Sequence, residues 1–116
     1  MNQKTLIKED LEVCVGIGAT ASNGRDCYPY YVSEVLPNGI LGIYRAGWHF
    51  DAQHPWEGGD GVVDPFDQQH TSDFYIKRRY GKWWQVDGSG KPIEPFTGKY
   101  LRLSFGRAHA FQDPSF

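Results

Sequence analysis

Four side chains in the middle of the chain have the chemistry of metal ligands. His49, Asp51 and His54 lie close together in the sequence, and His70 follows in the same segment. Imidazole nitrogens and carboxylate oxygens can together hold Zn²⁺ or Fe²⁺. Their spacing matches neither the H-E-x-x-H pattern of zinc enzymes nor the ligand order of a calcium loop. We therefore expect polar loop residues and no cofactor, and keep a metal-dependent enzyme as an alternative.

The sequence contains no recognisable motif for nucleophilic catalysis. There is no G-x-S-x-G elbow, and nothing in the spacing links either cysteine to a histidine. Cys14 and Cys27 also lack the C-x-x-C spacing of a zinc site, and whether they pair with each other is left open. These observations favour a binding protein over an enzyme.

The strongest candidate for a binding surface is a basic, aromatic stretch around residue 80. Two strand-like runs, 74–80 and 82–86, flank Gly81 and predict a β-hairpin. Arg and Trp dominate the energetics of protein interfaces, and cations beside aromatic rings can also pair with phosphates and stack bases. The predicted binding residues are Lys77, Arg78, Arg79, Tyr80, Lys82, Trp83 and Trp84.

Charge is divided unevenly along the chain. Residues 46–73 hold six acids and no Lys or Arg, whereas residues 74–107 hold eight basic groups and two acids. Three interpretations stay open: the acidic segment neutralises the basic strands, the basic hairpin binds a protein, or it binds nucleic acid or a nucleotide. The net charge of -2 and the pI near 6.0 weigh against a general polyanion binder.

The composition gives no signal for a membrane protein. Mean hydropathy is -0.55, and no apolar run approaches the roughly 20 residues that a membrane span needs. The apolar stretch at the N-terminus is too short for a signal peptide, so we expect a cytoplasmic protein. The oligomeric state is left open.

Strands must position these residues. The run 28–44 predicts a hairpin around Pro37-Asn38-Gly39, because proline presets φ and Asn-Gly accepts the positive φ of tight turns. Aromatic residues make up 16% of the chain, which suits strands better than helices. Strict alternation along the first strand of this hairpin places three residues on one face, namely Tyr31, Ser33 and Val35.

These segments predict one all-β domain over residues 1–116, with an inserted loop at 46–73. A small SH3-like or partly open β-barrel is the first choice, and a β-sandwich is the second. The inserted loop lacks a sustained period but contains large aromatic side chains, so we expect an ordered, acidic loop that these side chains pin in place.

Several motifs resemble those of small proteins encoded by phages and prophages. They are Val-Gly-Ile-Gly-Ala-Thr at 15–20, Tyr-Pro-Tyr-Tyr-Val-Ser-Glu-Val at 28–35, Asn-Gly at 38–39, Leu-Arg-Leu-Ser-Phe-Gly-Arg at 101–107 and Asp-Pro-Ser-Phe at 113–116. The resemblance covers most of the chain and implies a phage-borne accessory protein that binds a host protein, for example to inhibit a host defence. It implies no activity and assigns no catalytic residue.

Overall fold

The computed structural model describes residues 5–6, 12–22, 24–50, 59–93 and 102–112. The regular elements in these ranges are antiparallel β-strands and one 3₁₀ turn, so the expected all-β class is confirmed. No helix within these ranges is long and apolar enough to cross a membrane. The elements are β1 (Thr5–Leu6), β2 (Glu12–Val13), β3 (Gly18–Ser22), β4 (Cys27–Val35), η1 (Pro37–Gly39), β5 (Ile40–Arg45), β6 (Trp48–His49), β7 (Gly59–Asp60), β8 (Val62–Val63), β9 (Phe74–Arg79), β10 (Lys82–Val86), β11 (Leu103–Phe105) and β12 (Phe111–Gln112).

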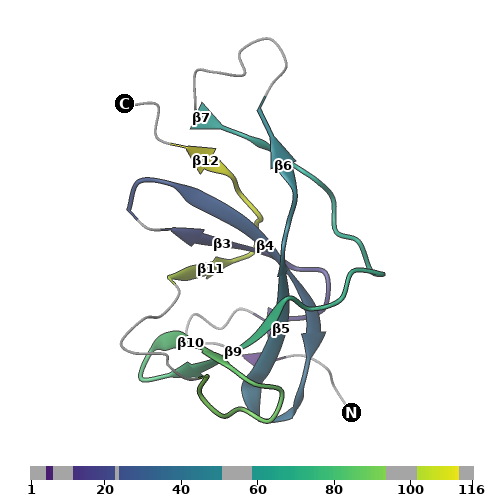
Figure 1. Ribbon diagram of the computed structural model, residues 1–116, viewed down its shortest axis with the longest axis vertical. Coiled ribbons are helices and arrows are strands. Elements are labelled where there is room, and N and C mark those ends of the chain that lie inside the picture. Colours follow the sequence, from purple (N-terminus) through teal and green to yellow (C-terminus); the bar gives the residue numbers. More distant parts are fainter. Residues whose placement is uncertain (1–4, 7–11, 23, 51–58, 94–101, 113–116) are drawn as a thin grey trace.

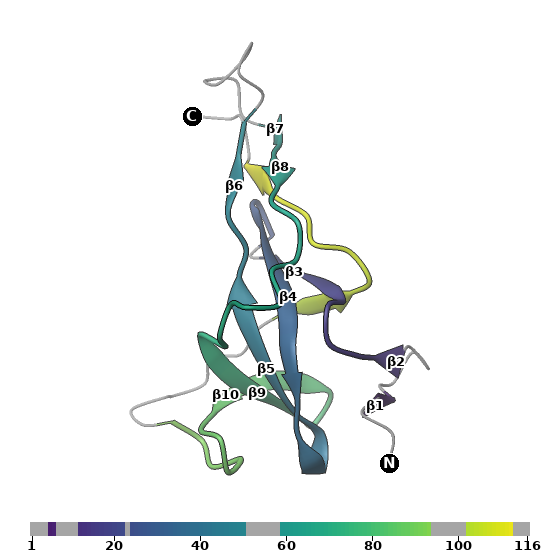
Figure 2. The same cartoon turned by 90° about the vertical axis from the view of Figure 1, so that its right-hand side faces the viewer.

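Most strands belong to one curled sheet (Figure 1). Its order is β10-β9-β5-β4-β12-β7, while β3 pairs with the other side of β4 and with β11. β6, β7, β8 and β12 lie at one end of the molecule and the β9–β10 hairpin lies at the other (Figure 2). The described strands at the two ends of this order, β10 and β7, do not pair with each other, so the sheet is open. An open sheet agrees with the partly open form and also with the β-sandwich that was the second choice, and an SH3-like connectivity stays a prediction.

β4 and β5 form the hairpin expected around residues 37–39. Asn38 and Gly39 have positive φ, 66° and 75°, which these two residue types accept at the lowest steric cost. The N–H of Leu36 donates to the carbonyl oxygen of Ile40 at 2.8 Å and closes the turn. The turn residues therefore fix the register of the central strand pair.

A β-bulge at Ser33 interrupts the alternation of β4. Val32 lies opposite Ile43, but Glu34 lies opposite the adjacent Gly42, so Ser33 has no partner in the register with β5. The hydroxyl of Ser33 donates instead to the carbonyl oxygen of Gly42 at 3.2 Å. One extra residue is thus accommodated within the strand.

The bulge reverses the direction of the side chains that follow it. Val35 joins Val32 on the face that packs against the core, and Glu34 shares the opposite face with Tyr31. The expected grouping of Val35 with Tyr31 and Ser33 is therefore wrong. The error arises because a single inserted residue leaves no mark in the pattern of polar and apolar residue types.

The hydrophobic core lies inside the curl of the sheet, between β3 and β11 on one side and β4, β5, β9 and β10 on the other. Leu41, Ile43 and Ile76 are fully buried at its centre, and each such side chain contributes roughly 1.5–3 kcal/mol. Trp83 of β10 meets Phe105 of β11 edge to face, with ring centroids 5.3 Å apart. This contact brings together β10 and β11, which do not pair with each other in the described sheet.

The inserted segment 46–73 contains short strands in its described part. β6 pairs with β8, and β7 pairs with β12 near the C-terminus. Residues 51–58, between β6 and β7, lie outside the described part of the chain. The segment returns to the sheet where the N–H of Asp73 donates to the carbonyl oxygen of Ile43 at 2.8 Å.

The two cysteines do not form a disulfide. Cys14 is exposed, Cys27 is half-buried at the start of β4, and both are free thiols. The question that the sequence left open is thereby answered for this structure.

Gly18 provides a test of how the C-terminal segment packs on β3. A Cβ at Gly18 would clash with the backbone nitrogen of Ala108, and the N–H of Gly106 donates to the Gly18 carbonyl at 2.8 Å. We expect Gly18→Ala to lower the free energy of unfolding by about 1–3 kcal/mol, because backbone must move. Gly88→Ala, where a Cβ meets open space, is the control for denaturant unfolding. Equal stability of the two variants would contradict this packing.

Candidate binding surface on the β9–β10 hairpin

The β9–β10 hairpin has a two-residue turn of unusual composition. Arg79 pairs with Lys82 in the register, which leaves Tyr80 and Gly81 as the loop. Both loop residues have positive φ, 55° and 74°, as a type I′ turn requires. Such turns favour Asn, Asp or Gly at the first position, whereas here a tyrosine occupies it.

The predicted binding residues divide between the two faces of this hairpin. The inner face carries Trp83, which is 6% exposed, and Arg78, its partner in the register. Trp83 packs in the core, so it stabilises the hairpin through its inner face. The sequence could not separate it from Trp84, because adjacent strand residues point to opposite faces and either tryptophan could have pointed inward.

The outer face and the tip carry the other predicted residues. Lys77 lies opposite Trp84 and Arg79 lies opposite Lys82, so these four share one face. Tyr80 at the tip is 91% exposed. We call these five residues the hairpin surface: Lys77, Arg79, Tyr80, Lys82 and Trp84.

A small pocket of about 240 Å³ opens on the hairpin surface. Its walls include Trp84, Val86 and Pro92, and a β-bridge between Val86 and Pro92 holds the last two together. The indole N–H of Trp84 donates to the carbonyl oxygen of Arg79 at 3.1 Å, which fixes the orientation of the ring. Pro92 could not be predicted as part of this surface, because the bend of the 87–91 loop is what brings Pro92 to the pocket.

Asp87 holds that loop in shape. Its carboxylate accepts hydrogen bonds from the hydroxyl and N–H of Ser89 and from the N–H of Lys91, at 2.7, 2.9 and 3.0 Å. These bonds, with the Ser89 hydroxyl foremost, lower the pKa of Asp87. These bonds hold the loop that leads to Pro92, which lines the pocket, in one conformation at neutral pH.

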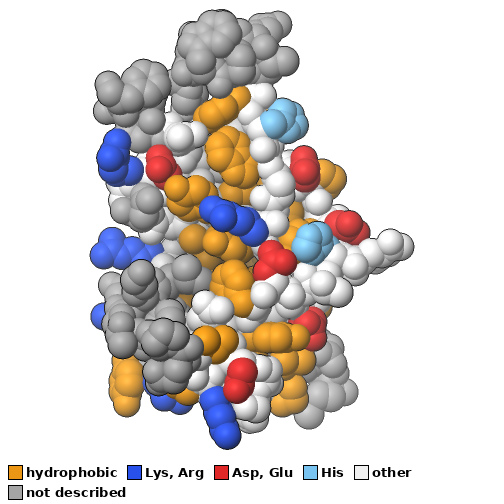
Figure 3. Space-filling model, viewed as in Figure 1, with side chains coloured by type: hydrophobic (Ala, Val, Ile, Leu, Met, Phe, Trp, Pro, Cys, Tyr) orange, Lys and Arg blue, Asp and Glu red, His pale blue; other side chains and the backbone are white. Residues whose placement is uncertain are grey.

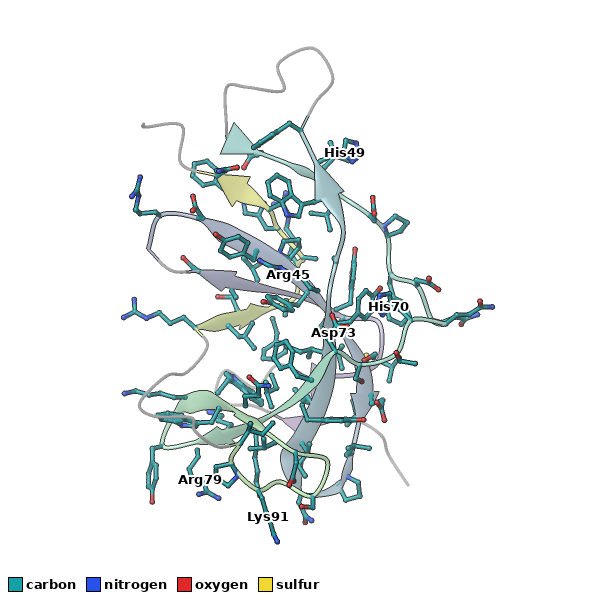
Figure 4. All side chains as sticks on the ribbon, viewed as in Figure 1. Arg45, His49, His70, Asp73, Arg79 and Lys91 are labelled. Carbon is teal, nitrogen blue, oxygen red and sulfur yellow. The ribbon has the colours of Figure 1, made fainter. Side chains whose placement is uncertain are left out.

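Three cations of β9 are not neutralised by the acidic segment in the described part of the chain. Within those residues, no carboxylate forms an ion pair with Lys77, Arg78 or Arg79. Figure 4 places Arg79 and Lys91 at one end of the molecule, far from His49. In Figure 3 the acidic and histidine side chains gather mainly on one side of the visible face, and most Lys and Arg lie on the other.

A polar cluster anchors the entry to β9 on the same outer face. The hydroxyls of Ser72 and Tyr75 donate to one carboxylate oxygen of Glu34, at 2.6 and 2.9 Å. The Ser33 and Ser72 hydroxyls are 2.6 Å apart. The cluster lies over Gly42, where a Cβ would collide with the Ser72 hydroxyl. These contacts fasten the start of the hairpin to the bulge in β4.

A larger hollow, of about 760 Å³, lies elsewhere, between the end of β5 and the 64–70 loop. Two of its polar side chains, Tyr44 and His70, stabilise the loop itself. The His70 ring stacks on Tyr44 with centroids 4.0 Å apart, and the Tyr44 hydroxyl accepts the N–H of Asp67 at 2.8 Å. The Tyr31 hydroxyl donates to the carbonyl oxygen of Asp64 at 2.7 Å. We interpret this hollow as the structural base of the loop.

The two metal-ligand candidates that the structure describes, His49 and His70, do not lie together. His49 lies on β6 and His70 lies on the 64–70 loop, well apart in Figure 4. Asp51 and His54 lie outside the described residues. Among the residues that are described, no group of three or more His, Cys, Asp or Glu side chains could hold a metal ion.

Comparisons with protein-family models, with curated proteins and with solved structures find no match.

Tyr75 offers a test of the cluster that anchors the hairpin. Its hydrogen bond to Glu34, aided by burial, raises the pKa of the Tyr75 phenol above its usual 10.0. A raised pKa means that the bond stabilises the fold fully below pH 10.0, and that this contribution is lost as the pH rises through the folded-state pKa. We expect Tyr75→Phe to cost at most about 1 kcal/mol near neutral pH, because the pair is partly exposed.

Denaturant unfolding at stepped pH measures this effect. The stability gap between wild type and Tyr75→Phe should close in alkaline solution, whereas Tyr80→Phe, which removes an exposed hydroxyl at the tip, should show no such gap. A gap that persists unchanged at high pH would show that the bond to Glu34 is not its source.

Proposed function

We propose that this is a non-enzymatic binding protein that engages another protein through the hairpin surface. The resemblance to phage-borne proteins supports a host protein as the partner, with the cytoplasm of the host cell as the site of action. Inhibition of a host defence or of a metabolic enzyme is the purpose that the same resemblance suggests.

The observation that carries the proposal is the state of Tyr80. It is 91% exposed and has a φ of 55°, so a large aromatic ring is held in water by a strained backbone. The turn requires the positive φ, but tyrosine is a costly residue for it, and an exposed ring gains little from burial. Strain of this kind, observed first, is a reason to infer function at that position.

The neighbours of Tyr80 fit an interface. Tyr, Trp and Arg are the residue types enriched at the energetic centres of protein interfaces. Arg79 is exposed beside the tip, and Trp84 is half-buried with its ring fixed by a hydrogen bond. A surface whose side chains are fixed before binding loses less conformational entropy when it binds.

Binding of nucleic acid is the second candidate, because cations beside an exposed aromatic ring can pair with phosphates and stack a base. The net charge of -2 weighs against it, since nucleic-acid-binding domains are usually strongly basic. Its distinguishing property is a steep loss of affinity as salt rises.

Tyr80→Asn separates binding from stability. Asparagine is favoured at this turn position, so we expect the variant to be as stable as wild type or more stable by up to about 1 kcal/mol. We also expect it to lose the partner, because the exposed ring is gone. Thermal unfolding and affinity capture from bacterial lysate, on immobilised wild type and variant, measure the two effects.

Val62→Asn is the matched control, because Val62 is also exposed (52%) but lies on β8 at the opposite end of the molecule. It should retain every protein that wild type retains. Identical captured proteins for wild type and Tyr80→Asn would refute the proposed surface. Captured material that nuclease digestion removes would favour the nucleic-acid alternative.

A further inference from the structure

We infer that the pocket on the hairpin surface binds one apolar side chain from a partner segment rich in Asp and Glu. The inference rests on the proposed function and specifies the chemistry of its partner. It is drawn from the size of the pocket, the nature of its walls and the charge around its opening.

The size of the pocket suits a single side chain. Its volume of about 240 Å³ is below the roughly 300–1,000 Å³ typical of sites for whole small molecules. Val86 is 4% exposed and forms the floor, with Trp84 and Pro92 as walls. An apolar side chain that enters this pocket would lose contact with water on several sides. Removal of apolar surface from water is the main source of favourable free energy in such a pocket.

The charge around the opening is positive. Lys77 and Arg79 both line the pocket, and their aliphatic stems can extend its apolar wall while their charged ends stay in water. Neither forms an ion pair with a carboxylate among the described residues. Carboxylates on each side of the entering side chain would meet these two cations, which gives the partner segment its acidic character.

The shape of the aromatic surface favours a peptide over a nucleic acid. The Trp84 ring is held by its hydrogen bond to Arg79 and serves as a pocket wall. Tyr80 is then the one ring among the residues of the hairpin surface with a largely free face. Proteins that bind single strands usually stack successive bases on several rings, which this arrangement does not provide.

The test uses the full chain, isotope-labelled for NMR, and the peptide Asp-Glu-Asp-Leu-Glu-Asp-Glu. We expect the peptide to shift the indole N–H of Trp84 and the amides of Gln85 and Val86. A peptide with Ser in place of Leu should bind about tenfold more weakly or worse, because the burial of one apolar side chain is lost. Lys77→Glu with Arg79→Glu should weaken binding of the Leu peptide several-fold, and most at low salt.

Arg107→Glu is the charge control, because Arg107 is exposed and does not line the pocket. It should bind the Leu peptide as wild type does. Three outcomes would overturn the inference: no binding of the Leu peptide, equal binding of the Leu and Ser peptides, or tighter binding of oligothymidylate, measured from the same resonances. The capture experiment with Tyr80→Asn uses no peptide, so the proposed function can survive the failure of this pocket.

Discussion

The pairing of β4 with β5 is the constraint on which the rest of the molecule depends. β4 contacts β3 and β12 as well as β5, and β9 joins the sheet through β5, with Leu41 opposite Ile76. Val32 of β4 and Leu41 and Ile43 of β5 are fully buried and point into the same core. The hairpin surface is therefore held in place by this pair of strands, because β5 is the direct neighbour of β9, and its position depends on their register.

The bulge in β4 converts this register into a rigid base for the hairpin. Because Ser33 is unpaired, Glu34 turns to the outer face, where it accepts hydrogen bonds from Ser72 and Tyr75. Gly42 leaves the space that the cluster fills. Backbone pairing with β5 and this side-chain cluster thus hold the start of β9 from two directions. A surface at the end of such a hairpin can keep its shape before it meets a partner.

Turn chemistry made both hairpins predictable, whereas the orientation of their side chains was only partly so. Asn38-Gly39 and Gly81 mark turns that the structure places where the sequence predicts them. The bulge at Ser33 was missed, because it depends on hydrogen bonds formed only after the strands pair. The short strands of the 46–73 segment were also missed, since two-residue strands have no period to detect.

The candidate surface shows the same division. Residue types alone located the cations and aromatic rings at 77–84, but the sequence did not show which tryptophan would be buried. Because side chains alternate along a strand, the hairpin packs one face in the core and presents the hairpin surface on the other. Trp83 meets Phe105 in the core, so the outer residues can change without altering that packing.

Because the outer residues of the hairpin are separate from the core packing, the strained backbone at Tyr80 is a reason to infer function at that residue. A natural sequence is expected to agree with its fold at each level, and local disagreement tends to mark a site kept for another reason. At a buried position, packing can offset an unfavourable φ, so the disagreement says little. Tyr80 has no such packing, because it is 91% exposed. Packing in the core therefore does not offset the cost of this conformation, and this is the reason for placing the proposed contact at Tyr80.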